Sequence, residues 1–479
     1  MSRASVVVVG GGISGLAAAW ELSGGVEEPT GSTPRIEVVE ANGCVGGSLV
    51  TAPFAGRVID LGADGFLARR PEAVTLVNEL GLSDELESIA ASGAWLWSLG
   101  ALHELPRDLV LGVPTNLRAI LDFKGVTWRA HLAARRDAHF PARLRVGEDA
   151  TIGDIVRTKL GSELAYRLVE PMIGGIQAGR IDELSARSVF PALYEAAKKG
   201  GSLMKALRPS GVTLPGPAST QVASGPVFCS LRNGVGSLAG ELLTRLVDRG
   251  VIVRSGVAVT AIRRTPAGGY PLEVDTYRTT TPANAVVLAT PAPVAGSLLG
   301  SLDPSLAALG DVHSASAAMV TYCIPRGEIE LPPDGTGVLV PLQTPWRNGE
   351  SIMVTAVTFL DRKWPRLRRD NDVVLRAHVG RIDDTRFLAL NDAELTARVT
   401  EELAALLPHF GTPSDSLVQR WPNGLPQYRV GHEDRVERAR EAAARYSCAL
   451  AGSAYDGVGI PASIGSGRRA ALDVLAMTT

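Results

Sequence analysis

Short apolar runs and helical patterns alternate along the first part of this chain. Residues 5–9 end in four consecutive valines, which is typical of a strand buried on both faces. Three glycines follow at once, and residues 16–22 then have the spacing of a helix. After a loop rich in turn formers, residues 36–39 form another apolar run that ends at Glu40. This segment therefore predicts a strand, a tight turn, a helix, a surface loop and a second strand.

The same kinds of pattern predict elements along the rest of the chain. We expect helices over 72–80, 154–169, 236–246, 392–407 and 461–476, and strands over 251–253, 272–274, 285–290 and 449–450. Alternating apolar runs over 338–359 predict an antiparallel sheet. Asp154 is expected to cap its helix and Pro171 to stop it. The segment 209–226 is rich in proline, glycine and serine and predicts an irregular connection.

Composition limits the classes of function. A chain of 479 residues predicts two or three domains, and a net charge of −2 excludes bulk attraction to nucleic acid. No uninterrupted apolar stretch is long enough for a transmembrane helix, and the N-terminal valine run fits a buried strand better than a signal peptide. The four cysteines are far apart, which argues against a zinc site or a disulfide framework. We expect a cytoplasmic protein without a metal. The sequence leaves open whether the protein makes peripheral contact with the inner face of the membrane.

One segment is strongly basic. The segment between Phe123 and Gly147 contains one acidic residue, Asp137, and six lysines and arginines: Lys124, Arg129, Arg135, Arg136, Arg143 and Arg145. Such a run is most often a solvated face. It can also be a surface for anionic lipid, an acidic partner or an anionic substrate. The sequence leaves these alternatives open.

The first turn has the spacing of a dinucleotide site. Gly10 permits the tight turn, Gly12 lets the backbone approach a pyrophosphate, and Gly15 lets the helix pack closely on the strand. The N–H groups of Ile13 and Ser14 open that helix, whose positive end favours phosphate. Glu40, at the end of the second strand, is placed to accept hydrogen bonds from ribose hydroxyls. Strand, turn, helix and terminal acid in this order predict nucleotide binding.

Two further glycine-rich stretches favour FAD over NAD. Gly46 and Gly47 follow the ribose acid closely and bring backbone near the ligand a second time, as a long cofactor requires. Near the C-terminus, Gly452 to Gly459 leads into a helix that starts at Ile460 and Pro461, and proline is tolerated at a first helical position. The N-terminus of this helix would stabilise negative charge on a reduced flavin.

These stretches resemble the flavin-containing amine oxidase superfamily and, within it, the protoporphyrinogen/coproporphyrinogen oxidase family. The resemblance spans nearly the whole chain and depends on five motifs in order: residues 60–71, 170–191, 228–238, 425–432 and 455–461. Two positions depart from the family pattern. Ala63 replaces the usual proline, and Arg180 is basic where the family has an acid-rich turn.

The resemblance implies a fold of mixed α/β and α+β class. A Rossmann-like FAD-binding domain assembled from distant segments would combine residues 1–69, 226–297 and 443–479. A mixed-sheet substrate domain would combine 70–105, 191–225 and 298–442, with a linker in the second segment. A helical module over 106–190 would cover the substrate entrance. The cofactor contacts implied in addition to those above are Ser48, Gly62, Ala63, Asp64, Val257 and Ala289.

The resemblance also implies the chemistry. A porphyrinogen would lose six electrons in three turnovers of non-covalently bound FAD, with molecular oxygen reduced to hydrogen peroxide and no catalytic side chain required. Arg69 and Arg70 are candidates for propionate contacts, although either could face solvent. Gly174 and Gly175 would let backbone lie against the macrocycle, although a plain turn would also use them. The run at residues 67–71 resembles the soluble bacterial branch, which favours coproporphyrinogen III over protoporphyrinogen IX.

Other functions stay open at this point. A flavin amine oxidase would share the fold, but many of those tether the flavin to a cysteine after the terminal glycines, and none follows Gly452 here. A carotene desaturase would lack the Leu-Pro-Gln-Tyr signature at 425–428. A non-catalytic flavin-bearing scaffold could dock a haem-pathway partner, and transient docking to a ferrochelatase would suit a labile product in any case.

Overall fold

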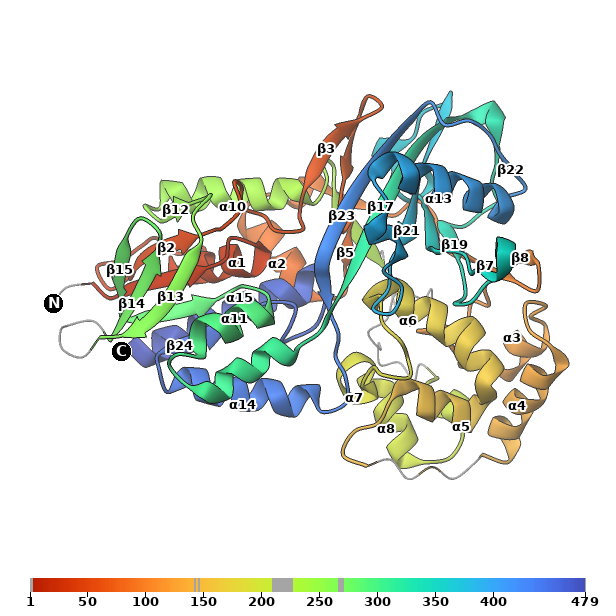
Figure 1. Cartoon of the computed structure of the whole chain (residues 1–479), viewed down its shortest axis with the longest axis horizontal. Helices are drawn as coiled ribbons and strands as arrows, with labels where there is room; N and C mark the ends of the chain where they lie inside the picture. The colour runs from red at the N-terminus through yellow and green to blue at the C-terminus, as the bar shows by residue number, and fades with distance from the viewer. Residues whose placement is uncertain (1–2, 142–143, 145–146, 209–226, 266–270, 479) are drawn as a thin grey trace.

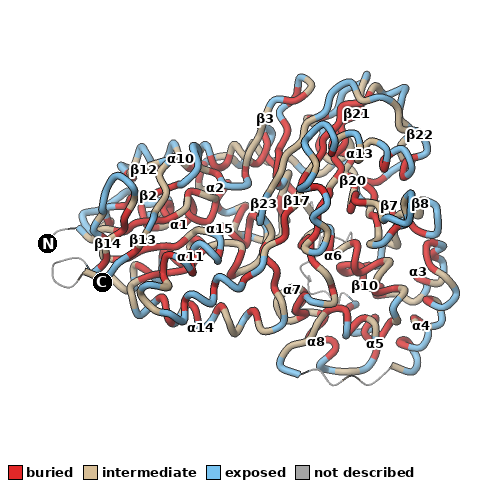
Figure 2. The backbone as a smooth tube through the Cα atoms, viewed as in Figure 1, coloured by how far each residue is buried: buried red, intermediate tan, exposed pale blue. Residues whose placement is uncertain are grey.

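The computed structural model describes residues 3–141, 144, 147–208, 227–265 and 271–478. The described chain forms two lobes (Figure 1). One lobe contains a parallel sheet and both chain ends, and the other contains a larger mixed sheet above a group of helices. Buried residues gather in the strands of both sheets and on the inner sides of the helices (Figure 2).

The parallel sheet is assembled from distant parts of the chain. Its order is β12 (Ile252–Arg254), β2 (Arg35–Val39), β1 (Ser5–Val9), β16 (Ala285–Leu288) and β24 (Cys448–Leu450). All four pairings are parallel. The valines of β1 are almost fully buried because helices cover both faces of the sheet. This arrangement confirms the expected Rossmann-like fold built from separated segments.

Two sets of helices cover that sheet. Side chains of α1 (Ile13–Leu22), α2 (Pro71–Glu79), α10 (Gly236–Asp248) and α15 (Ile460–Thr478) pack in the core on one face. Side chains of α11 (Ala292–Leu299) and α14 (His432–Ala444) pack in the core on the other, together with the small sheet of β13 (Val259–Arg264), β14 (Leu272–Thr276) and β15 (Thr280–Ala283).

The second lobe is built on a seven-stranded mixed sheet. Its order is β23 (Asp415–Pro426), β17 (Ser314–Pro325), β21 (Asp372–Val379), β20 (Val354–Phe359), β19 (Gly337–Leu339), β7 (Trp95–Ser98) and β8 (Ala101–Glu104). Only β19 and β7 pair in parallel. The antiparallel pair predicted within 338–359 is β19 with β20. Helix α13 (Asp392–Leu406) packs on this sheet, as its amphipathic pattern predicted.

The helices below that sheet share a core of their own. They are α3 (Leu117–Leu121), α4 (Trp128–His139), α5 (Ile152–Leu164), α6 (Glu170–Gln177), α7 (Ala186–Val189), α8 (Pro191–Lys199) and α9 (Leu203–Ala206). The remaining described strands and α-helix are β3 (Thr51–Phe54), β4 (Arg57–Asp60), β5 (Phe66–Leu67), β6 (Leu86–Ser88), β9 (Leu109–Val110), β10 (Val113–Pro114), β11 (Phe228–Leu231), β18 (Ile329–Glu330), α12 (Leu360–Lys363) and β22 (His409–Phe410).

The ends of the predicted helix at 154–169 are wrong. Thr151 caps α5 by accepting a hydrogen bond from the Asp154 N–H (3.0 Å), and the Asp154 carboxylate pairs with Arg157 at 2.6 Å. The chain then passes through one π-helical turn (Ala165–Val169) into α6, where Pro171 occupies the first turn. Proline is tolerated there because first-turn N–H groups have no intrahelical partner, so Pro171 does not stop the helix.

The predicted irregular connection at 209–226 lies outside the described residues. The domain boundaries inferred from the resemblance stay a prediction.

Candidate cofactor and substrate site

The first glycine turn lies at the carboxyl edge of the parallel sheet, where β1 is flanked by β2 and β16 and the strand order changes direction. Gly10 has φ +105°, and its N–H donates to the Val39 carbonyl (2.8 Å). A Cβ atom at Gly10 would lie 2.5 Å from the Ala289 carbonyl oxygen, and one at Gly15 would lie 1.9 Å from the Gly10 carbonyl oxygen. The fold itself therefore requires glycine at positions 10 and 15.

Gly12 is different. Its φ of −68° and ψ of 175° suit any residue, and a Cβ atom there would come no closer than 3.9 Å to the Cα of Gly47. Neither backbone conformation nor packing among the described residues requires a glycine at this position. The space beside Gly12 is therefore the space that a closely approaching ligand would fill.

Helix α1 offers an anion site beside that space. Gly12 is its N-cap and has no side chain, and the first turn holds no acid. The first N–H groups of a helix have no intrahelical partner, and the helix dipole adds positive potential. Ile13 and Ser14, both buried, contribute two of these groups. The turn and the helix end thus fit the pyrophosphate of a dinucleotide.

Glu40 stands at the end of β2 with its side chain directed at the glycine turn. One carboxylate oxygen accepts the Gly11 N–H (2.6 Å), and the other accepts the backbone N–H (2.8 Å) and side-chain amide (2.7 Å) of Asn42. A carboxylate has about four lone-pair sites and these bonds use three, so Glu40 can still accept one ribose hydroxyl. The Val257 N–H donates to the Glu40 carbonyl (2.9 Å), which places Val257 beside it.

The second glycine pair lies against the first turn. The Gly46 N–H donates to the Gly11 carbonyl (2.8 Å), and Gly46 bridges Gly12. The predicted contacts Ser48 and Gly62 are also neighbours, because a Cβ atom at Gly62 would lie 2.3 Å from the Ser48 carbonyl oxygen. Residues far apart in the sequence are thus brought together along one edge of the sheet.

The C-terminal glycine loop reaches the same edge, since it follows the parallel strand β24. The Gly452 N–H donates to the Ser466 hydroxyl (2.9 Å), and the Asp456 carboxylate pairs with Arg440 (2.6 Å). These bonds hold the loop in place. Helix α15 begins directly after Gly459, with Ile460 and Pro461 in its first turn, so its N-terminal end also lies at the sheet edge.

Asp64 does not present a free carboxylate to a ligand. It accepts two hydrogen bonds from Lys363 Nζ (2.8 and 3.0 Å) and one from Trp364 Nε1 (3.0 Å). Burial raises its pKa, but the charges of Lys363 and Arg376 outweigh burial and hold the pKa below its usual range. The ion pair links the segment after β4 to the second lobe. Ala63, beside it, is exposed.

Arg376 was missed by the sequence analysis. It is 1% exposed on β21 and donates to the backbone carbonyl oxygens of Asp60 and Gly62 (the latter at 3.2 Å). It therefore fixes the path of the predicted flavin-side segment. An arginine within the otherwise apolar run 373–377 was the signal that could have revealed it.

The two candidate propionate ligands, Arg69 and Arg70, lie directly before α2 and are both partly buried. Arg70 precedes α2 and pairs with Glu72 (2.7 Å). Arg69 is less exposed than a surface arginine, and burial lowers its pKa. Anion binding at Arg70 would therefore compete with Glu72.

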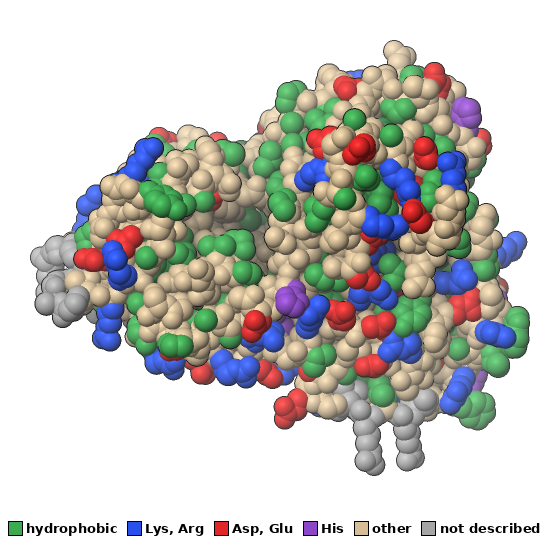
Figure 3. Space-filling view, viewed as in Figure 1, with side chains coloured by type: hydrophobic (Ala, Val, Ile, Leu, Met, Phe, Trp, Pro, Cys, Tyr) green, Lys and Arg blue, Asp and Glu red, His purple; other side chains and the backbone are tan. Residues whose placement is uncertain are grey.

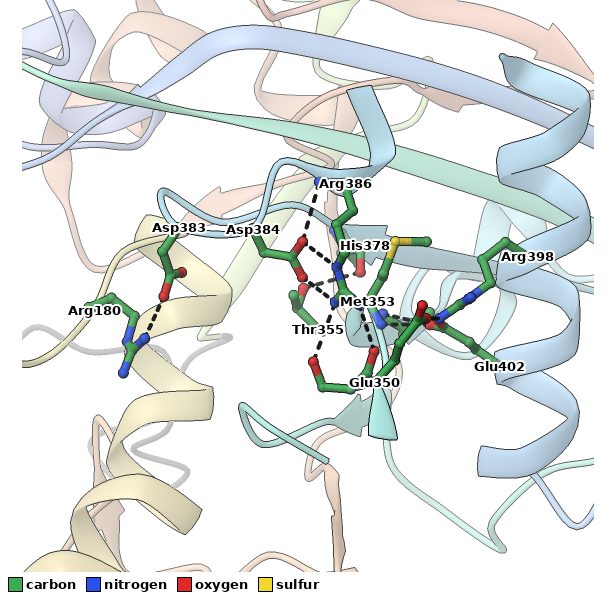
Figure 4. A network of polar contacts seen from close by, with 12 residues as sticks. Arg180, Glu350, Met353, Thr355, His378, Asp383, Asp384, Arg386, Arg398 and Glu402 are labelled. Atoms are coloured by element: carbon green, nitrogen blue, oxygen red, sulfur yellow. Dashed lines mark hydrogen bonds and ion pairs between the residues drawn. The ribbon is translucent and has the colours of Figure 1, made fainter. Parts of the chain in front are cut away.

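Gly174 and Gly175 lie inside α6 and not in a turn. A Cβ atom at Gly174 would lie 2.5 Å from the Arg381 guanidinium. Arg381 and Arg180 flank the fully buried Glu170 (Arg180 at 3.1 Å, Arg381 at 3.7 Å), and burial raises the pKa of Glu170. Figure 4 shows Arg180 also pairing with Asp383 on the loop after β21. The absence of a side chain at Gly174 thus leaves space for the ion pairs that connect α6 with the loop after β21.

The late motif at 425–432 joins the lobes. The Gln427 side chain donates to the Gln177 carbonyl at the end of α6 (2.7 Å), and the Ser185 N–H donates to the Tyr428 carbonyl (2.8 Å). The Tyr428 hydroxyl donates to the Ser453 carbonyl in the C-terminal glycine loop, and its ring stacks on His432. Figure 3 shows a recess between the two lobes.

The described part of the chain contains neither a membrane-spanning helix nor a cluster of metal ligands. None of its helices is long and apolar enough to cross a membrane. Within the same residues, no cluster of histidine, cysteine, aspartate and glutamate side chains could hold a metal ion.

Comparison with known proteins agrees with the resemblance drawn from the motifs. The chain is 33% identical to coproporphyrinogen III oxidase of Bacillus subtilis (strain 168), covering 98% of this chain and 97% of that protein. It is 32% identical to protoporphyrinogen oxidase of Macaca fascicularis, covering 98% of each. A crystal structure from Exiguobacterium sp. 255-15 superposes with a TM-score of 0.84 at 30% identity over 98% of each chain. Cyclohexylamine oxidase from Brevibacterium oxydans shares the fold, with a TM-score of 0.68 at 16% identity over 99% of each chain. Residues 13–475 match the family described as flavin containing amine oxidoreductase, and the chain belongs to that family.

Proposed function

We propose that this protein oxidises coproporphyrinogen III to coproporphyrin III in haem biosynthesis, using FAD and molecular oxygen. The observation that carries the proposal is end-to-end similarity to proteins of that name, at 33% identity in Bacillus subtilis and 35% in Mycobacterium leprae (strain TN), with 97% or more of each relative covered. Protoporphyrinogen IX is the second candidate substrate, because a protoporphyrinogen oxidase also matches over the full length.

The proposed cofactor is non-covalently held FAD. Gly12 and the start of α1 would hold the pyrophosphate, Glu40 the ribose, and the start of α15 the flavin end. When bound, the flavin would take two electrons and two protons from the substrate in each of three turnovers and pass them to oxygen, giving three molecules of hydrogen peroxide. Three of the four cysteines are buried, and burial raises the pKa of Cys448, the one nearest Gly452, to about 12. That thiol is a poor nucleophile for tethering a flavin.

The roles of the protein are placement and exclusion of water. Arg376 and the Asp64–Lys363 pair fix the segment between the cofactor edge and the mixed sheet. Arg69, at the end of that segment, would pair with a propionate at the rim of the macrocycle. Both candidate substrates carry propionates, so this contact fits either of them, and the choice of coproporphyrinogen III rests on the similarity to the relatives of that name.

An aerobic assay tests the proposal. Purified holoprotein is given coproporphyrinogen III and protoporphyrinogen IX side by side, and porphyrin fluorescence and peroxide are followed against an enzyme-free control. We expect faster formation of coproporphyrin and three peroxides per porphyrin. A preference for protoporphyrinogen would overturn the substrate. Activity on neither would favour an amine substrate or a flavin-bearing scaffold.

The cofactor is tested separately. Acid precipitation of the holoprotein should release all of the flavin, and mass analysis should identify it as FAD. A coloured pellet would mean that the flavin is covalently attached, and release of a mononucleotide would contradict the assignment of the pyrophosphate site.

A further inference from the structure

The two faces of the mixed sheet differ in what covers them. On β21, Leu375 and Val379 are almost fully buried in the core that the sheet shares with α13. Arg376 and His378 alternate with these residues, so their side chains point to the other face. The guanidinium of Arg376 agrees with this direction, since it reaches the backbone carbonyls of the flavin-side segment at residues 60–62. The second face is therefore the one that meets the flavin-side segment.

A row of cross-strand neighbours on this second face is partly exposed. The strand register places Met319 of β17 on one side of His378 and Ala356 of β20 on the other. The row continues to Gln419 on β23 and to Leu339 on β19. Residues directly opposite each other in a sheet share a face, and all five of these side chains are partly exposed. We call these five residues the floor row.

The floor row lies between the two parts of the molecule that the proposed reaction uses. Trp421, two positions beyond Gln419 on β23, donates to the Leu61 carbonyl in the flavin-side segment (3.2 Å). At the other end of the row, a Cβ atom at Gly175 of α6 would lie 3.8 Å from the Leu339 side chain. A macrocycle held between the cofactor edge and α6 would therefore lie over the floor row.

His378 is the one ionisable side chain of the floor row. Its Nε2 atom lies 3.1 Å from the Thr358 hydroxyl, and its Nδ1 atom makes no hydrogen bond to any residue that the structure describes. Burial, and then the charge of Arg376, lowers the pKa of His378 from 6.5 to about 3, so the ring is neutral at neutral pH. A neutral imidazole has one N–H and one lone pair, and the Thr358 hydroxyl can accept the N–H at Nε2. The lone pair of Nδ1 is then left for a ligand.

The backbone of His378 is fixed as well. The Thr355 hydroxyl on β20 donates to the His378 carbonyl (3.1 Å), a contact that Figure 4 shows. The ring is thus held from two sides, by Thr355 through the main chain and by Thr358 through Nε2. A side chain held in this way can bind a substrate without first being ordered.

We propose that His378 accepts a hydrogen bond from a pyrrole N–H at the centre of the porphyrinogen and that this bond strengthens as the substrate is oxidised. The inference rests on the proposed function. Each oxidation breaks a C–H bond at a bridging carbon, whose hydride goes to the flavin, and a pyrrole N–H bond, whose proton goes to solvent. Positive charge spreads to the neighbouring pyrrole as the hydride leaves, so its N–H becomes a stronger donor and an uncharged acceptor stabilises it. Met319, Ala356 and Leu339 supply apolar contact for the rest of the macrocycle.

Rapid mixing of the holoprotein with coproporphyrinogen III without oxygen tests this role. His378→Phe keeps a flat ring and removes the acceptor, so the rate constant of flavin reduction at saturating substrate should fall about 10- to 100-fold. The substrate concentration that gives half of the maximal rate should change less, by about 3-fold or below, because the hydrogen bond is strongest in the transition state. His378→Asn supplies a side-chain carbonyl oxygen as acceptor and should recover the rate to within about 5-fold of the unaltered protein.

A histidine outside the floor row serves as the matched control. His409 is exposed on β22, and His409→Phe should be reduced as fast as the unaltered protein. Circular dichroism and bound flavin check the folding of every variant, and His378→Leu takes the place of His378→Phe if the latter does not fold. Full activity of the variant without an acceptor, or a His378→Asn variant that is just as slow, would overturn the role of His378 alone. An unaltered protein whose flavin neither porphyrinogen reduces would overturn the proposed function and this inference with it.

Discussion

Replacing Gly12 with alanine separates what the fold requires from what the cofactor requires. The backbone at Gly12 (φ −68°, ψ 175°) is open to alanine, and the added Cβ atom would lie 3.9 Å from its nearest described neighbour, the Cα of Gly47. The free energy of unfolding of the Gly12→Ala apoprotein should therefore lie within about 0.5 kcal/mol of that of the unaltered apoprotein. It could also be higher by up to about 1 kcal/mol, because alanine lowers the entropy of the unfolded chain.

The effect on cofactor binding is expected to be much larger. A methyl group placed where the pyrophosphate passes costs about 1–3 kcal/mol when the surroundings cannot move away. That energy corresponds to FAD binding about 5- to 150-fold weaker. The assay is titration of apoprotein with FAD by flavin fluorescence, beside urea unfolding of the same apoprotein.

Two other glycines calibrate this result. Gly15→Ala puts a Cβ atom 1.9 Å from the Gly10 carbonyl oxygen, so it should lower both apoprotein stability and FAD affinity. Gly240→Ala, on the exposed side of α10 with nothing within 4 Å, should raise stability by about 0.5–1 kcal/mol and leave FAD affinity unchanged. Normal FAD binding by Gly12→Ala would contradict a pyrophosphate site beside Gly12. A loss of apoprotein stability as large as that of Gly15→Ala would contradict the open space seen there.

Three further changes test other parts of the site. Arg69→Gln should raise the KM for coproporphyrinogen III about 10-fold in steady-state kinetics, because a charge-assisted hydrogen bond to a propionate would be lost; an unchanged KM would contradict a propionate contact at Arg69. Glu170→Gln removes the buried charge between two arginines and should cost about 3–5 kcal/mol in urea unfolding, whereas a loss below about 1 kcal/mol would mean that the carboxyl is uncharged in the fold. Burial, and then the charge of a neighbouring arginine, lowers the pKa of His432 from 6.5 to about 4, so the unfolded chain gains a proton that the folded chain does not as pH falls from 6.5 toward 4. Stability is lost over that window, and His432→Asn should reduce the loss between pH 7 and pH 5 by about 2 kcal/mol in unfolding titrations; an unchanged pH dependence would exclude His432 as the source.

The dinucleotide fold was predictable from sequence because its signals are local. Four buried valines, a glycine spacing and a terminal acid lie within forty residues. The valines are typical of a buried strand, the glycines of a tight turn beside a ligand, and the acid of a ribose site. The far glycine loop was found for the same reason, since a helix start after Gly459 is visible in the sequence.

The interactions between separated segments were not predictable in this way. The sequence predicted that Pro171 would end a helix. In the structure a π-helical turn at 165–169 precedes α6, so Pro171 lies in the first turn of a new helix, and no local sequence signal indicates that turn. The glycine at 174 was assigned to the substrate, whereas the guanidinium that occupies its missing side-chain space comes from Arg381, more than two hundred positions later. The pairing of Asp64 with Lys363 has the same character. Ion pairs between residues far apart in the chain produce no periodic pattern in a single sequence, so they cannot be predicted from it.

In the proposed reaction, the bound flavin takes electrons directly from coproporphyrinogen III. The most direct test mixes the oxidised holoprotein with coproporphyrinogen III in the absence of oxygen and follows the visible absorbance of the flavin. We predict that the flavin bleaches at a rate at least as fast as turnover, that coproporphyrin appears in proportion, and that the colour returns when oxygen is admitted. A flavin that stays oxidised while excess coproporphyrinogen III is present would contradict the claim, whatever porphyrin formed later in air.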